Sequence, residues 1–313
     1  MNAIVKFICD NDARFRFLAS SGAYKSMPDD VYLRRYFKAR TGRELNLENP
    51  LTFNEKLQWL KLYNRKDEFT NLVDKYEVKN IVAAELGEEY VIPTLGVWES
   101  FDKIDFDSLP NQFVLKCTHD SGGLAICSDR FKFDINSARR KLDRSMKRNY
   151  YWFGREWPYK NVKPRIIAEQ YMEDETNKGD LSDYKIHCFN GKPKVIQVIT
   201  DRFSEEGMIN AHYDLSWNKL DIVRGHYSAG NKTIPRPAEM DEMLELAKKL
   251  SAGIPYLRTD FYIVNHQVYF GELTFFPASG FRPFFPEKWD RIWGDWIKLP
   301  TDNVAESVFK KGR

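Results

Sequence analysis

Two carboxylates on either side of a tight turn are the residues of this sequence best suited to chemistry. Asp260 lies within a predicted strand over 256–264, and Glu272 lies near the end of a second predicted strand over 267–274. The Asn265-His266 turn between them predicts a hairpin, so the two carboxylates can converge on one point. Burying carboxylates among apolar residues is costly unless a divalent cation compensates their charge. By spacing alone, a metal site and the wet face of an amphipathic hairpin fit equally well.

A second chemical feature is a small-residue loop between two predicted strands in residues 110–128. Lys116 ends the first strand, and Ser121, Gly122 and Gly123 form the turn before the second. Consecutive glycines let backbone N–H groups face an anion, and the lysine can supply a point charge to phosphate oxygens. The same residues also suit an ordinary hairpin turn. The spacing is not that of a P-loop.

The elements around these residues follow from local patterns. Residues 71–87 predict a helix that carries Lys75 and is followed by a short strand leading into Pro93. Residues 165–172 predict a strand, and 183–202 predict a hairpin closed by Asn190-Gly191, with Lys185 and His187 on one strand face. Residues 203–236 have weak periodicity, which favours an irregular insertion or an active-site cover.

The rest of the chain predicts scaffold. Residues 28–64 indicate helices, the second beginning at a Thr52-x-x-Glu55 capping box, and residues 240–251 indicate another. Residues 134–150 predict a basic helix, and an aromatic-basic segment follows over 150–163, for which ordinary packing is the simplest interpretation. The apolar helical face at 289–297 fits core packing better than a membrane-interface contact.

Composition limits the class of protein. The 313 residues are 42% hydrophobic and 15% aromatic, so a folded chain with a sizeable core is expected. The formal charge of +3 is too balanced to favour nucleic acid as a partner. Four scattered cysteines without zinc spacing, no signal peptide and no membrane span predict a cytoplasmic protein.

Taken together, the order of these motifs resembles the ATP-grasp superfamily. More closely, TFNEKLQWLKLY, DKYEVK, DYKIHCFNGKPK, RTDFY and FGELTFFPASG are similar to its TupA-like branch, associated with teichuronopeptide and surface-polysaccharide synthesis. The resemblance implies an α+β ATP-grasp fold that holds the nucleotide between two lobes. It divides the chain into an N-terminal helical region over 1–109, a small lobe over 110–172 and a large lobe over 173–313.

The resemblance also implies a nucleotide site. Lys75 and Lys116 would hold the ATP phosphates under a flexible lid, and Lys116 would also act in catalysis. Asp183 is the first choice for the ribose carboxylate, with Glu173 and Glu175 as competitors. The lid would be formed by Ser121, Gly122 and Gly123. The adenine-binding hinge would be formed by Glu169, Gln170, Tyr171 and Met172, and Lys185 would be one further cofactor-binding residue.

The same resemblance assigns Asp260 and Glu272 as Mg²⁺ ligands and Arg258 as the group that steadies charge at the acyl centre. One departure concerns Thr274, which stands where typical superfamily members have Asn, although a hydroxyl or a water can complete Mg²⁺ coordination. The resulting expectation is an ATP- and Mg²⁺-dependent carboxylate–amine ligase. It would join an amino acid or amine to a sugar acid or polysaccharide precursor, with peripheral contact to membrane-linked precursors and the oligomeric state left open.

Three alternatives remain at this stage. A glycosyltransferase is suggested only by the acidic motif Asp105-Phe106-Asp107, which lies in a polar connection. An ATP-grasp kinase would use the same residues but release a phosphorylated product. A non-catalytic binding module is the third alternative, kept open by Thr274.

Overall fold

The structure, a computed structural model, describes residues 10–174, 181–201, 207–224 and 233–300. Its helices are α2 Asn11–Ser20, α3 Asp29–Thr41, α4 Phe53–Tyr63, α5 Glu68–Val73, α6 Glu77–Leu86, α7 Ile135–Met146, α8 Tyr151–Gly154, α9 Met240–Leu250 and α10 Lys288–Trp296. Its strands are β1 Thr94–Trp98, β2 Phe113–Cys117, β3 Leu124–Cys127, β4 Ile166–Gln170, β5 Asp183–Phe189, β6 Lys192–Thr200, β7 Ile209–Tyr213, β8 Lys219–Leu220, β9 Val223–Arg224, β10 Tyr256–Val264, β11 Gln267–Thr274 and β12 Phe284–Phe285. The α+β class is confirmed.

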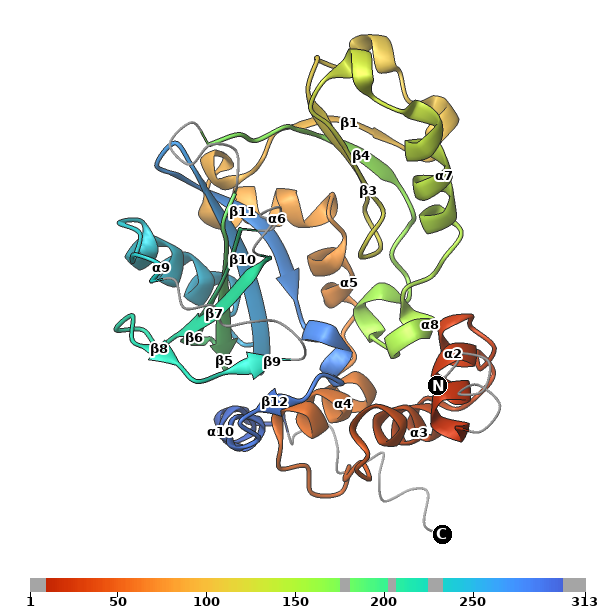
Figure 1. Cartoon of the computed structure of the whole chain (residues 1–313), viewed down its shortest axis with the longest axis vertical. Coiled ribbons are helices and arrows are strands. Elements are labelled where there is room, and N and C mark those ends of the chain that lie inside the picture. The colour runs from red at the N-terminus through yellow and green to blue at the C-terminus, as the bar shows by residue number, and fades with distance from the viewer. Residues whose placement is uncertain (1–9, 175–180, 202–206, 225–232, 301–313) are drawn as a thin grey trace.

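Two antiparallel sheets form two lobes (Figure 1). The small lobe has the strand order β1-β4-β2-β3, with α7 packed beside it. The large lobe has the order β11-β10-β5-β6-β7-β8. Helices α5 and α6 lie between the two sheets (Figure 1).

Two tight turns organise the large sheet. The β5–β6 hairpin closes at Asn190 and Gly191, and the β10–β11 hairpin closes at Asn265 and His266. All four turn residues have positive φ, between 49° and 74°. This matches the right-handed twist that two-residue hairpins require. Both predicted hairpins are therefore confirmed.

The two faces of the large sheet differ in chemistry. One face presents apolar side chains such as Ile186, Leu257 and Phe261, all buried, and α9 packs against it. The other face carries a row of polar residues, because cross-strand partners share a face. This row runs across five strands through Glu272, Asp260, Lys185, Gln197 and His212.

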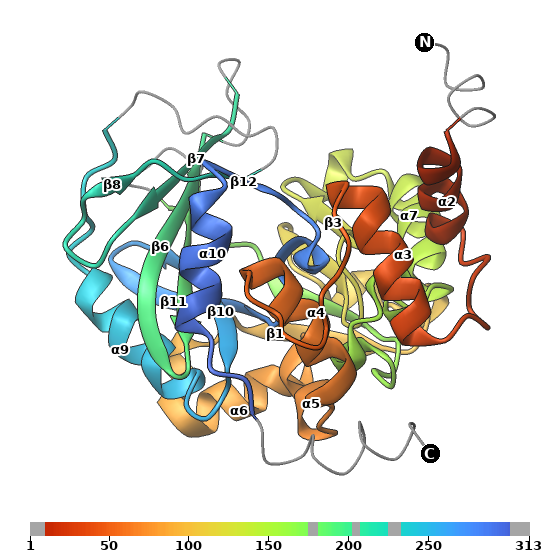
Figure 2. The same ribbon diagram turned by 90° about the horizontal axis from the view of Figure 1, so that it is seen from below.

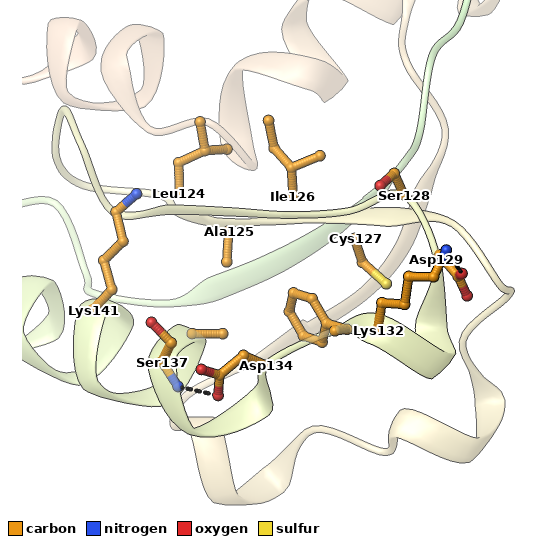
Figure 3. Close-up of a pocket in the computed structure, with 12 residues that line it drawn as sticks. Leu124, Ala125, Ile126, Cys127, Ser128, Asp129, Lys132, Asp134, Ser137 and Lys141 are labelled. Atoms are coloured by element: carbon orange, nitrogen blue, oxygen red, sulfur yellow. Dashed lines mark hydrogen bonds and ion pairs between the residues drawn. The ribbon is translucent and has the colours of Figure 1, made fainter.

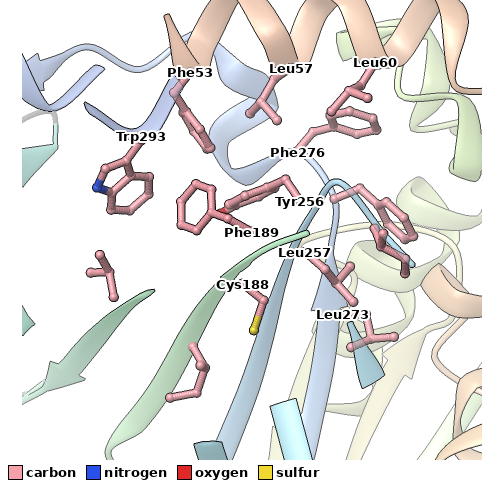
Figure 4. Packing of buried hydrophobic residues seen from close by; sticks show 14 of the residues in the cluster. Phe53, Leu57, Leu60, Cys188, Phe189, Tyr256, Leu257, Leu273, Phe276 and Trp293 are labelled. Carbon is pink, nitrogen blue, oxygen red and sulfur yellow. The ribbon is translucent and has the colours of Figure 1, made fainter. Parts of the chain in front are cut away.

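Helices α4 and α10 pack together at one end of the large sheet, and α3 and α2 follow on the side of α4 that is away from the sheet (Figure 2). Thr52 and Glu55 form the predicted capping box at the start of α4, which directs Phe53 into the core. Figure 4 shows Phe53, Phe189, Tyr256 and Trp293 gathered there, and the Phe53 and Trp293 ring centroids are 5.2 Å apart. Trp293 is fully buried, so the apolar face of α10 packs in the core as predicted.

A buried polar network fixes the loop after β11. Its 3₁₀ turn, Pro277–Gly280, follows the strand that carries Glu272. The Lys61 Nζ donates to the Ser279 carbonyl at 2.8 Å, and the Ser279 hydroxyl donates to Glu156. Burial lowers the pKa of Lys61 to about 7 against the attraction of Glu156. The aromatic segment before Glu156 also packs in the interior, where Arg155 is buried with its guanidinium carbon 4.4 Å from the centre of the Tyr32 ring.

Three predictions about elements were wrong. Lys75 lies between α5 and α6, because the Asp74 carboxylate accepts hydrogen bonds from the N–H groups that start α6. The strand near Pro93 begins after it, at Thr94. Part of 203–236 is regular, since β7 and β8 extend the large sheet; residues 202–206 and 225–232 of this stretch lie outside the described residues.

Candidate nucleotide site between the two sheets

Asp260 and Glu272 are direct cross-strand partners in the β10–β11 hairpin. The side chain of Asp260 is 2% exposed, whereas that of Glu272 is 42% exposed because it lines an open cleft. The two predicted carboxylates therefore converge at one point, on a face that is neither fully wet nor apolar.

Cations hold these carboxylates in place. The guanidinium of Arg258 donates to Asp260 Oδ1 and Oδ2 at 2.6 and 2.7 Å and to Glu272 Oε1 at 2.8 Å. Lys185, the cross-strand neighbour of Asp260, donates to its Oδ2. Desolvation by the surrounding protein tends to raise the pKa of Glu272, but the positive charges of Arg258 and two nearby lysines outweigh this effect and hold the pKa at about 2. Glu272 is thus ionised at neutral pH.

The small lobe contributes a second charged group. Glu169, on β4, is buried between Lys79 and Lys116, with each Nζ 2.5 Å from one of its carboxylate oxygens. Burial tends to raise the pKa of Glu169, but the two lysines outweigh it and hold the pKa at about 2. Lys79 was not predicted. Glu169 was expected at the hinge, and its side chain contacts these lysines.

The loop of Ser121, Gly122 and Gly123 lies beside these groups. The Lys75 Nζ donates to the Asp120 carbonyl at 2.5 Å, and the Ser145 hydroxyl of α7 donates to the Asp120 carboxylate. A Cβ on Gly123 would lie 2.6 Å from Ser145 Oγ, so the loop must approach α7 without a side chain there. Gly122 has φ 112°, a conformation that favours glycine.

A cavity of about 280 Å³ between the sheets brings most of the predicted residues together. The predicted residues that line this cavity are Lys75, Lys116, Ser121, Gly122, Gly123, Glu169, Asp183, Lys185, Asp260 and Glu272. The residues Gln170, Tyr171, Met172, Arg258 and Thr274 are not among its lining residues. Lys79, Tyr262 and Phe270 line it without having been predicted. Tyr262 could have been found, because it follows Asp260 at i+2 on its strand.

The carboxylate pair suits Mg²⁺. Among the described residues, no cluster of three or more His, Cys, Asp or Glu side chains is placed to hold a metal ion. Mg²⁺, however, is commonly bound by one or two carboxylates together with substrate phosphates. Asp260 and Glu272 offer hard oxygen donors at a cleft that also contains the lysines and the glycine loop. Thr274 Oγ1 donates to Glu272 Oε1 at 3.2 Å and so holds one of these carboxylates.

Two larger cavities in the described part of the chain contain none of the predicted site residues. One, of about 400 Å³, lies between β3 and α7 (Figure 3), and the other, of about 420 Å³, lies near the β10–β11 turn. The acidic motif considered for a glycosyltransferase lies elsewhere again. Asp107 is 98% exposed and paired with Arg130, and Asp105 caps its own 3₁₀ turn. No described contact of this motif supports a metal site.

Comparisons with known proteins identify the family of this chain. A model of the TupA-like ATPgrasp family matches residues 55–298. A comparison with curated proteins finds no match. No described helix is long and apolar enough to cross a membrane.

Among solved structures, the chain is similar to D-alanine–D-alanine ligase from Bacillus anthracis complexed with ATP, at 16% identity and TM-score 0.36, covering 65% of this chain and 53% of that one. It is similar to the Helicobacter pylori enzyme at 15% identity and TM-score 0.39, covering 79% and 69%. It also resembles N5-carboxyaminoimidazole ribonucleotide synthetase with ADP at 15% identity and TM-score 0.41, covering 71% and 50%. The chain thus spans about half the length of the first structure.

Proposed function

Because this chain belongs to the TupA-like ATP-grasp family, we propose that it is an ATP-dependent carboxylate–amine ligase. The observation that supports the proposal most strongly is the joint placement of two charge clusters at one cleft. The first cluster consists of Glu169 and Lys116 from the small lobe with Lys79 from α6. The second consists of Asp260 and Glu272 from the large lobe. A triphosphate between them would meet cations on one side and carboxylates fit for Mg²⁺ on the other.

The site residues have separate roles in this proposal. Lys75, Lys79 and Lys116 bind the phosphates of ATP, which the glycine loop covers. Asp260 and Glu272 hold Mg²⁺, which when bound neutralises charge on the phosphate oxygens. The hinge of Glu169 to Met172 receives adenine, and Asp183 receives the ribose, with Glu173 and Glu175 as alternatives; Glu175 lies outside the described residues.

The chemistry proceeds in two steps. A carboxylate oxygen of the acid substrate attacks the γ-phosphorus of ATP, and the bond from that phosphorus to the β,γ-bridging oxygen breaks, releasing ADP. The amine then attacks the acyl carbonyl, inorganic phosphate leaves, and the amine proton passes to solvent. Both steps develop charge on oxygens, which the Arg258 and Lys116 cations stabilise. Closure of the glycine loop would exclude water from the acyl phosphate.

The finer proposal concerns the substrates. We infer an acid that is a sugar acid or polysaccharide precursor and an amine that is an amino acid or simple amine, in bacterial surface-polysaccharide synthesis. Family membership supports this choice.

The test is ADP release with panels of sugar acids and amines, together with detection of the amide by mass spectrometry. Glu272→Gln removes a proposed Mg²⁺ ligand and should abolish turnover. Glu99→Gln is the control, because it makes the same substitution at a surface carboxylate, which contacts Lys163 and Lys103. Full activity of Glu272→Gln would overturn the proposal. ADP release with a stable phosphorylated product and no amine requirement would select the kinase alternative.

A further inference from the structure

Among the described residues, Arg224 is a buried cation without a carboxylate partner. It lies on β9 and is 5% exposed, with its guanidinium carbon 4.2 Å from the Phe284 ring centre and 5.9 Å from that of Trp293. Its one described hydrogen bond runs from Nη2 to the Arg282 carbonyl at 3.3 Å, and its Nε has no partner. Leaving a buried guanidinium without a counter-charge is costly unless an anion binds it.

The carboxylate that attracts Arg224 already has other hydrogen-bond partners. Asp290 attracts Arg224, but its carboxylate oxygens accept hydrogen bonds from Arg43 at 2.9 Å and from the Asn54 amide at 3.0 Å. Burial lowers the pKa of Arg224 to about 10, so the guanidinium remains charged at neutral pH. The positive charge therefore persists without an ion pair in the described part of the chain.

A second unsatisfied side chain accompanies it. His212 is 1% exposed, and neither ring nitrogen makes a hydrogen bond with a described residue. Burial and Arg224 lower the pKa of His212 to about 3, although the Ile222 backbone acts in the opposite direction. The ring is therefore neutral and offers one N–H donor and one acceptor. Its centroid lies 6.4 Å from that of Trp293, the ring that Arg224 also approaches.

These two side chains lie near the proposed reaction site but apart from it. His212 ends the polar row that begins at Glu272 and passes through Asp260. Three strand spacings separate Asp260 from His212, which is about 14 Å between backbones. His187 lies between them, on the strand beside Arg258, and its ring is tilted against that of Trp293 with the centroids 4.7 Å apart. The polar face thus extends beyond what a nucleotide and its metal would occupy.

We propose that Arg224 and His212 form a subsite for a second anionic group of the acid substrate. The reacting carboxylate lies at Arg258, and the second group, a carboxylate or a phosphate, binds the guanidinium and the imidazole N–H. This inference rests on the proposed ligase function and specifies its substrate as a sugar acid with a further anion. The required charge explains why an arginine is kept unpaired in a buried aromatic environment.

The experiment is isothermal titration with AMP-PNP and Mg²⁺ filling the nucleotide site. The probes are D-glucuronic acid 1-phosphate, digalacturonic acid and D-glucuronate, which test a second phosphate, a second carboxylate and a single carboxylate. Wild-type protein should bind one of the two dianions at least tenfold more tightly than D-glucuronate, and the preferred dianion identifies the second group. Arg224→Met should lose this preference, Arg224→Lys should keep part of it, and His212→Gln should weaken it.

Controls separate this subsite from a structural role and from the nucleotide site. Arg236→Gln removes a surface arginine paired with Asp241 and should keep the preference for the dianion. Arg224→Met should unfold at the same temperature as wild type or higher, because it removes an unpaired buried charge. Equal binding of all three probes by wild type, or an unchanged preference in folded Arg224→Met, would overturn the subsite. Failure of AMP-PNP to bind would instead refute the proposed function.

Discussion

Replacing Glu169 with Gln tests how this buried carboxylate stabilises the fold through its two lysine partners. Glu169 is 5% exposed and contacts both Lys79 and Lys116 at 2.5 Å. Its pKa falls from 4.5 to about 2 in the folded protein. At 1.36 kcal/mol per pKa unit, ionised Glu169 adds about 3 kcal/mol to the free energy of unfolding. Glu169→Gln should lose roughly this amount at neutral pH and leave two lysines without their counter-charge.

The contribution of Glu169 to the free energy of unfolding should fall as the pH is lowered. A carboxylate with a depressed folded pKa contributes its stability above its unfolded pKa and loses it as pH falls through the folded value. The difference between wild type and Glu169→Gln should therefore shrink from about 3 kcal/mol at pH 6 to about 1 kcal/mol at pH 3. Urea unfolding monitored by tryptophan fluorescence at both pH values measures it.

The matched control is Glu99→Gln, since Glu99 contacts Lys163 and Lys103 at the surface with 56% of its side chain exposed. Exposed ion pairs contribute little, so this variant should remain close to wild type at both pH values. The reasoning fails if Glu169→Gln matches Glu99→Gln at pH 6, or if the deficit of Glu169→Gln does not change with pH.

Three further outcomes are expected. Lys79→Met should weaken AMP-PNP binding about tenfold or more in calorimetry, as loss of a charge-assisted hydrogen bond predicts, and unchanged affinity would exclude Lys79 from the site. Gly123→Ala should weaken the same binding, because its Cβ would lie 2.6 Å from Ser145 Oγ, while an unaltered affinity would show that the loop adapts freely. Lys61→Met should lower the free energy of unfolding, measured in urea, by about 3 kcal/mol, because it leaves the buried Glu156 without a counter-charge. Adding Glu156→Gln should recover most of this loss, and a double variant as unstable as Lys61→Met would contradict the coupling of the two residues.

Local patterns predicted most elements of the fold. The Asn190-Gly191 and Asn265-His266 turns identified their hairpins, because positive φ at both residues is a local requirement that the chain meets by itself. Lys79 could not be recognised in the same way. A lone helical lysine looks solvated, and its partner Glu169 is 90 residues away (169 − 79) on another element. Asp74 did carry a usable signal, since an aspartate before a helix commonly caps it.

The convergence of Asp260 and Glu272 depends on one residue. An uninterrupted hairpin closed at Asn265-His266 would pair Asp260 with Gly271, and Glu272 would face the opposite side. The observed register passes from Phe261↔Phe270 to Asp260↔Glu272, so Gly271 is the extra residue of a bulge.

A glycine suits this bulge, because a Cβ at Gly271 would lie 2.8 Å from the ring of Tyr262. Deleting Gly271 should restore the regular register and turn the Glu272 side chain to the other face. We expect the deletion variant to keep its far-ultraviolet circular dichroism but lose Mg²⁺-dependent AMP-PNP binding, as in Glu272→Gln. A folded deletion variant that still bound AMP-PNP in a Mg²⁺-dependent manner would show that Glu272 needs no bulge to reach the site. The proposed metal site therefore depends on a single inserted glycine as much as on its two carboxylates.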